Sequence, residues 1–157
     1  MRTTAHRVSI ITLLTILAFA FSNANAQERT QISLAYYPTT IIGVTASIPM
    51  FTTQDVTHSA RAGLTYAFDG LPALNATYIL SGPREGRTQT YVGAGVRLAF
   101  PAAPAVSPSV SWHALAGVNV EITHSFSAFT EVVVAGNSFG TRMSFGVGVS
   151  YAFGGSN

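Results

Sequence analysis

Apolar and polar residues alternate with a period of two along most of the chain after residue 27, and this period predicts β-strands. In the stretch 89–100, for example, one face would carry Val92, Ala94, Val96, Leu98 and Phe100, and the other Tyr91, Gly93, Gly95, Arg97 and Ala99. The i, i+3, i+4 repeat of an amphipathic helix does not recur. The pattern therefore predicts an all-β protein.

Eight strands are predicted, separated by segments rich in Pro, Gly, Asn and Ser. They cover residues 32–37, 41–50, 59–68, 73–81, 89–100, 109–122, 126–135 and 141–153. Segments 51–58 and 82–88 are expected to be polar connections. The predicted fold is an eight-stranded antiparallel up-and-down transmembrane β-barrel.

The distribution of charge between the two strand faces predicts which face meets lipid. All five charged residues within the predicted strands lie on the face of small residues: Arg61, Arg97, Glu121, Glu131 and Arg142. An Arg that faces lipid at mid-bilayer costs about 2–4 kcal/mol, so the uncharged face of large residues should point outward. A soluble lipocalin-like barrel would invert this arrangement, and a two-sheet sandwich would expose small residues with few charges to water.

Composition supports a membrane environment. Charged residues are 9% of the chain, against roughly 25% in soluble domains. Most predicted strands reach the ~9–11 residues that a spanning strand needs. Aromatic residues expected near strand ends would form the girdles at the two membrane interfaces, and they are Tyr36, Tyr66, Phe68, Tyr78, Phe100, Trp112, Tyr151 and Phe153.

The N-terminus predicts a secretory signal peptide over residues 1–26, with the barrel domain over 27–157. Basic residues precede the apolar stretch from Val8 to Phe21, and Ala24-Asn25-Ala26 is typical of a cleavage site. A membrane anchor is the alternative, but the apolar run is short for a span. After cleavage six Arg would balance six acidic residues, which gives no indication of a nucleic-acid partner. Cys is absent, which excludes disulfides and thiolate metal sites.

From Tyr91 onward the sequence resembles small outer-membrane barrels of the OmpA transmembrane-domain and OmpX type. The resemblance rests on the stretches Tyr91 to Arg97 and Ala116 to Glu131. It also rests on a C-terminal strand similar to the signal read by the barrel-assembly machinery, with Val147, Val149, Tyr151 and Phe153 as its apolar positions. The resemblance implies the outer membrane of a diderm bacterium, export by the general secretory route, and periplasmic chaperones during biogenesis. Four residues follow Phe153, which departs from a terminal aromatic residue.

A periplasmic N-terminus would place residues 38–40, 69–72, 101–108 and 136–140 in outward loops. These loops are short for ligand binding. An eight-stranded barrel has an interior just wide enough for side chains, so the inward charges and His113 should form a closed lumen network. By height along the strands, Glu131 would meet Arg97, and Glu121 would meet Arg61. A narrow pore for small or apolar solutes is the alternative.

An enzyme is a further alternative, because some eight-stranded barrels, such as lipid A deacylases, use a Ser, a His and an acid on the barrel wall. The candidates are His124, Ser125, Ser127 and Glu131, but no oxyanion-hole motif accompanies them. His58 and His113 lack metal-ligand spacing with any acid. We therefore expect a monomeric structural envelope protein in contact with outer-membrane lipids, without catalytic activity, metal or cofactor.

Overall fold

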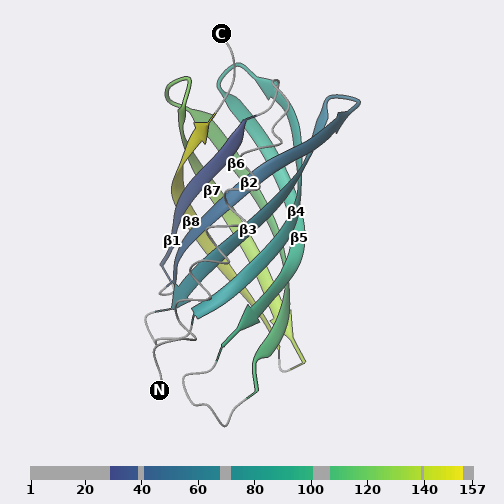
Figure 1. Ribbon diagram of the computed structural model, residues 1–157, viewed down its shortest axis with the longest axis vertical. Coiled ribbons are helices and arrows are strands. Elements are labelled where there is room, and N and C mark those ends of the chain that lie inside the picture. The colour runs from purple at the N-terminus through teal and green to yellow at the C-terminus, as the bar shows by residue number, and fades with distance from the viewer. Residues whose placement is uncertain (1–28, 39–40, 68–71, 101–106, 139, 154–157) are drawn as a thin grey trace, which may run out of the picture.

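The computed structural model describes residues 29–38, 41–67, 72–100, 107–138 and 140–153, which form a closed antiparallel β-barrel (Figure 1). Each strand pairs with the next along the chain, and β1 pairs with β8 to complete the closure. The strands are β1 (Thr30–Tyr37), β2 (Ile41–Thr53), β3 (Val56–Ala67), β4 (Pro72–Glu85), β5 (Thr88–Ala99), β6 (Ser109–Glu121), β7 (Phe126–Asn137) and β8 (Gly140–Phe153). The predicted fold class is confirmed. The predicted signal peptide, residues 1–26, lies outside the described residues.

The two faces of the strands are oriented as the alternation predicts. Large apolar side chains such as Val92, Val96 and Phe145 are about half exposed on the outside of the barrel. Glu131, His113 and Phe129, from the opposite faces, are buried inside it. Lipocalin-like orientation and a two-sheet sandwich are both excluded, the first by the outward apolar face and the second by closure.

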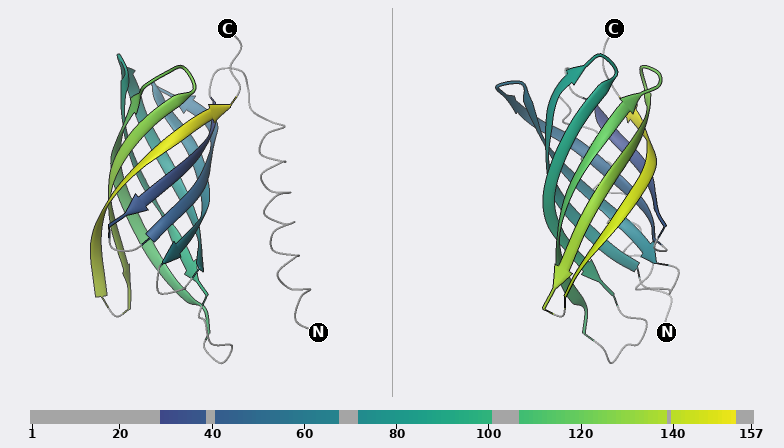
Figure 2. Two further views of the ribbon diagram at one scale, coloured as in Figure 1. Left: turned by 90° about the vertical axis from the view of Figure 1, so that its left-hand side faces the viewer. Right: turned by 180° about the vertical axis from the view of Figure 1, so that it is seen from behind.

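The strands are tilted against the long axis of the barrel (Figure 2). Residues that face each other around the barrel therefore follow a spiral. Opposing residues lead from Gln31 through Ser47, Arg61, Thr77, Gly95, His113 and Ala135 to Arg142. On β8, however, Gln31 faces Ala152. One circuit thus shifts the register by ten residues, from 142 to 152, and strand tilt of this kind is what lets a sheet close.

Two hairpins at one end correct the sequence-based prediction. We call this end, where β1 begins and β8 ends, the terminal end, and the opposite one the loop end (Figure 1). Segments 51–58 and 82–88 are mostly strand: β2 and β3 join at a turn of Gln54 and Asp55, and β4 and β5 join at Gly86 and Arg87. A register shift interrupts each hairpin, between Pro49 and Phe51 and between Ser81 and Arg84.

Aromatic rings gather on the outer surface toward both ends. At the terminal end the Tyr151 ring contacts both Phe126 and Phe153 edge to face. His58 stacks on Phe51 and shares a 2.6 Å hydrogen bond with the Tyr78 hydroxyl, which accounts for a tyrosine in the middle of β4. Tyr36, Tyr66 and Trp112 are exposed toward the loop end. Among the described residues no helix is long and apolar enough to cross a membrane.

Candidate functional site in the barrel lumen

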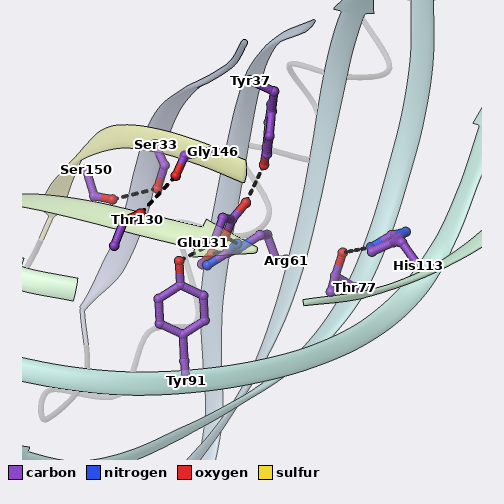
Figure 3. A network of polar contacts seen from close by, with 11 residues as sticks. Ser33, Tyr37, Arg61, Thr77, Tyr91, His113, Thr130, Glu131, Gly146 and Ser150 are labelled. Atoms are coloured by element: carbon purple, nitrogen blue, oxygen red, sulfur yellow. Dashed lines mark hydrogen bonds and ion pairs between the residues drawn. The ribbon is translucent and has the colours of Figure 1, made fainter. Parts of the chain in front are cut away.

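Glu131 of β7 is the centre of a polar cluster inside the barrel (Figure 3). Its side chain is only 2% exposed. One carboxylate oxygen, Oε1, accepts a hydrogen bond from the Tyr37 hydroxyl. The other, Oε2, accepts a 2.9 Å hydrogen bond from the Tyr91 hydroxyl. It also forms an ion pair with Arg61, whose Nη1 donates to it at 3.1 Å. Three donors from β1, β3 and β5 therefore satisfy one buried carboxylate, as a charge removed from water requires.

Glycines on the intervening strands let the two tyrosines reach Glu131. Gly146 pairs with Glu131 and adjoins Val147, the last β8 residue that pairs with β1, while Gly117 lies between Glu131 and Tyr91 in the register. A Cβ atom at Gly146 would lie 2.4 Å from the Tyr37 ring, and one at Gly117 would lie 2.4 Å from the Tyr91 ring. Each ring thus lies along the barrel wall over a strand that has no side chain at that point.

Arg61 and an apolar group complete a layer across the lumen. The Arg61 guanidinium lies 5.2 Å from the centroid of the Tyr91 ring, a cation–π distance, and its Nε donates to the Ser47 hydroxyl at 3.1 Å. Ile79, Tyr91 and Leu115 are buried together, with Val133 packed against them. We call Tyr37, Arg61, Ile79, Tyr91, Leu115 and Glu131 the central layer.

Two cavities lie on either side of the central layer. The larger, about 520 Å³, opens at the terminal end, and we call it the vestibule. The smaller, about 100 Å³, lies toward the loop end and is lined by Tyr37, Thr77, Arg97 and His113 among others. Arg61 lines both cavities, so the barrier between them is one layer of side chains thick.

The charged residues of the vestibule are largely satisfied within the protein. Arg84 forms an ion pair with Glu121, whose other carboxylate oxygen lies 3.6 Å from His124 Nδ1. Arg29 donates to the backbone carbonyl of His124. Arg61 is paired with Glu131, so each arginine of this cavity interacts with a group of the protein itself.

The smaller cavity is held by neutral hydrogen bonds between neighbouring strands. Thr77 Oγ1 and His113 Nε2 are 2.8 Å apart, and they meet over Gly95, which lies between them in the register. Asn75 donates to Thr65 Oγ1 at 3.1 Å. Arg97 also lines this cavity. His113 is therefore a hydrogen-bonded lumen residue.

In the structure Glu131 and Glu121 each form an ion pair with a different arginine from the one predicted by height along the strands. Glu131 pairs with Arg61, which the height argument assigned to Glu121, and Glu121 pairs with Arg84. Pairing by height fails because the strands are staggered by ten residues around the barrel and because Arg84, expected in a connection, lies in β4. The six predicted lumen residues thus fall in separate places: Arg61 and Glu131 in the central layer, Glu121 in the vestibule, Arg97 and His113 in the smaller cavity, and Arg142 exposed at the loop end.

The candidate catalytic residues are not brought together. Glu131 is committed to the central layer, and His124, whose side chain is 78% exposed, lies beside Glu121. Ser125 and Ser127 line the vestibule, but neither hydroxyl is found in a hydrogen bond with His124 among the described residues. The arrangement lacks the nucleophile-to-base contact that acyl transfer requires.

Sequence reasoning missed Tyr37 and Tyr91 as members of the polar cluster. Both alternate onto the small-residue face, where two large aromatic residues are unusual. The available signal was this mismatch in size, together with the inward glycines at 117 and 146. That both hydroxyl groups donate to Glu131 could be recognised only once the stagger of the strands was known.

No protein-family model matches the chain, and no curated protein matches its sequence. Solved structures do share its fold. The N-terminal β-barrel domain of Pseudomonas aeruginosa OprF superposes with a TM-score of 0.58 at 17% identity, covering 80% of this chain and 96% of that one. The Yersinia pestis outer membrane protein Ail gives 0.57 at 12% identity, covering 81% and 100%. The outer membrane enzyme PagL gives 0.50 at 12%, covering 80% and 100%.

These likenesses agree with the closed topology and show the fold of this chain. It is the small eight-stranded barrel that natural outer-membrane proteins share with de novo designed transmembrane β-barrels, one of which superposes with a TM-score of 0.57 at 14% identity. The fold occurs in an enzyme as well as in the other barrels compared, so it does not by itself decide activity.

Proposed function

We propose that this protein is an integral outer-membrane protein of a diderm bacterium, with a structural role in the envelope and a lumen closed by its own side chains. The observation that carries the proposal is the outward face. Within the described part of the chain twenty-four large apolar side chains are exposed, far more than a soluble monomer of this size leaves in water. The charged residues buried inside also agree with a barrel whose outer surface is in contact with lipid.

Cell fractionation of the full chain tests the location. After expression in a diderm host, we expect the protein in the outer-membrane fraction, released by detergent and not by high salt. A closed barrel should also migrate differently on a gel before and after boiling, because heating unfolds it. Recovery from the soluble periplasm with unchanged mobility would contradict the proposal.

The C-terminal strand supports a role for the barrel-assembly machinery in insertion. Val147, Val149, Tyr151 and Phe153 all point outward from β8, the strand that closes the barrel against β1. An alternating apolar face on the last strand is the feature that the resemblance to OmpA-type barrels associates with recognition. Export through a signal peptide over residues 1–26, with periplasmic chaperones on the route, is part of the same proposal.

A narrow pore is the second candidate function, and one observation favours it. The central layer is a single side chain thick at Arg61, with a cavity on each side. Planar-bilayer recordings of the refolded protein separate the candidates. A closed lumen gives no steady single-channel steps, whereas such steps would show that the central layer opens.

We propose no catalytic role, although PagL is an outer membrane enzyme with the same fold. The proposal rests on the separation of the candidate residues, since Glu131 is held by Tyr37, Tyr91 and Arg61.

A further inference from the structure

The vestibule at the terminal end is large enough to hold a small molecule. Its volume of about 520 Å³ lies within the ~300–1,000 Å³ range of ligand pockets. Arg61 and Ile79 of the central layer line it, so the central layer forms the inner end of this cavity. Its mouth lies at the end formed by the extended β2–β3 and β4–β5 hairpins (Figure 1).

The electrostatics of this cavity favour an uncharged ligand. Arg84 and His124 both interact with Glu121, Arg61 is held by Glu131, and Arg29 donates to a backbone carbonyl. The remaining charged residue of the lining, Asp55, is exposed at the turn between β2 and β3. An ionic ligand would have to displace these internal partners and would gain little net charge attraction in return.

Hydroxyl and amide groups make up most of the remaining polar lining. Gln89 and Asn119 face each other across β5 and β6, and both line the cavity with Ser59, Ser81 and Ser127. Gln89 Nε2 already donates to the Gly82 carbonyl at 3.0 Å. Asn119 Oδ1 is a buried acceptor that has no hydrogen-bond partner among the described residues. A buried acceptor left in this state loses the hydrogen bond it would make to water, and a ligand hydroxyl recovers that bond when the Asn119 carboxamide turns toward the cavity.

We propose that the vestibule binds a small uncharged polyhydroxylated solute, of the size of a mono- or disaccharide. The Asn119 carboxamide turns toward the cavity, and its Oδ1 then accepts a hydrogen bond from one of the hydroxyl groups of the solute. The hydroxyl groups of such a solute form hydrogen bonds of the same kind as the water that they displace. The proposal goes beyond a structural role, and it concerns one end of the lumen whether or not the central layer opens.

Asparagine side-chain resonances provide the test, because the two sides of the central layer each carry a reporter. Asn119 lines the vestibule, and Asn75 lines the smaller cavity beyond the central layer. The full chain, refolded into lipid nanodiscs with isotope-labelled asparagine, is titrated with sucrose. We expect the Asn119 amide signals to shift saturably in the millimolar range, while those of Asn75 stay in place.

Two further titrations make the result decisive. Asn119→Leu, checked for folding by its heat-shifted gel mobility, should weaken the sucrose response of the backbone amides of Gln89 and Ser81 about fivefold, since one hydrogen bond is worth roughly 1 kcal/mol. Potassium glutamate should produce no saturable shift. A linear or absent sucrose response at Asn119, an equal response at Asn75, or saturation by glutamate alone would overturn the proposal.

Discussion

At the scale of single residues, Glu131 shows how the barrel solves the problem of an inward charge. Its carboxylate lies deep in the lumen, where desolvation of an unpaired charge would cost several kcal/mol. Two hydroxyl groups and one guanidinium occupy its two oxygens. Removal of the negative charge should therefore leave the Arg61 cation buried without compensation.

Glu131→Gln is accordingly expected to destabilise the barrel by roughly 3–5 kcal/mol, the usual cost of breaking a buried ion pair from one side. Urea unfolding in lipid vesicles, followed through the fluorescence of Trp112, the only tryptophan of the chain, measures the change. Arg142→Gln is the control, because Arg142 is exposed at the loop end and its loss should stay within about 0.5 kcal/mol. Equal effects from the two variants would mean that the buried pair contributes nothing special.

A substitution at Gly146 tests whether the absence of a side chain at a glycine gives the Tyr37 ring its place. The three atoms nearest to a Cβ at this residue all belong to the Tyr37 ring, the first at 2.4 Å, so Gly146→Ala should cost about 1–3 kcal/mol through overpacking. In a Tyr37→Ala background the ring is gone, and the same change should cost little. The double-mutant cycle of unfolding free energies measures this coupling. If the losses of unfolding free energy from Gly146→Ala and Tyr37→Ala simply add, the effect of Gly146→Ala does not come from the Tyr37 ring.

The inward direction of Glu131 and Arg61 could be predicted from alternation alone, since a period of two fixes the face of every residue in a regular strand. Their pairing could not be predicted in this way. It depends on how far each strand is shifted against its neighbours, and that stagger is a property of closure, which no single strand encodes.

At the scale of elements, two bulges explain why the hairpins at the terminal end were predicted as connections. An extra residue in one strand reverses which face the following residues occupy. Met50 and Phe51 are both exposed for this reason, and beyond Gly82-Pro83 the side chain of Arg84 lines the vestibule. The alternation that identifies a strand is broken at these points although the hydrogen-bonded pairing continues.

The two hairpin turns offer a matched pair of substitutions. Asp55 has a φ of 65° and Gly86 a φ of 62°, a left-handed conformation that costs a non-glycine residue about 1–2 kcal/mol. Gly86→Ala should lower stability by about 1 kcal/mol, because a Cβ there meets nothing within 4 Å and only backbone strain remains. Asp55→Gly should raise stability by a comparable or smaller amount. Urea midpoints that move in the same direction for both variants would contradict this account.

At the scale of the whole molecule, the barrel has the inside and outside of a water-soluble protein exchanged. Its outer surface carries large apolar side chains, while charges and hydroxyl groups line the lumen. This exchange was predictable because it depends only on which face each residue occupies, and the low charge content agrees with it. The two-cavity lumen was not predictable, because its volumes depend on how Tyr37, Tyr91 and Arg61 fill the interior between strands far apart in sequence.

The membrane environment predicts that the cost of an outward charge depends on its depth. Val132 lies in the middle of β7 and Val110 at the loop-end start of β6, and both side chains point outward. In a bilayer, Val132→Arg should cost about 2–4 kcal/mol and Val110→Arg about 0–1 kcal/mol, because only the first places the guanidinium in hydrocarbon. Reversible unfolding from lipid vesicles measures both values. In water the two exposed positions would accept Arg equally well, so equal and small costs would show that the apolar outer face meets something other than lipid.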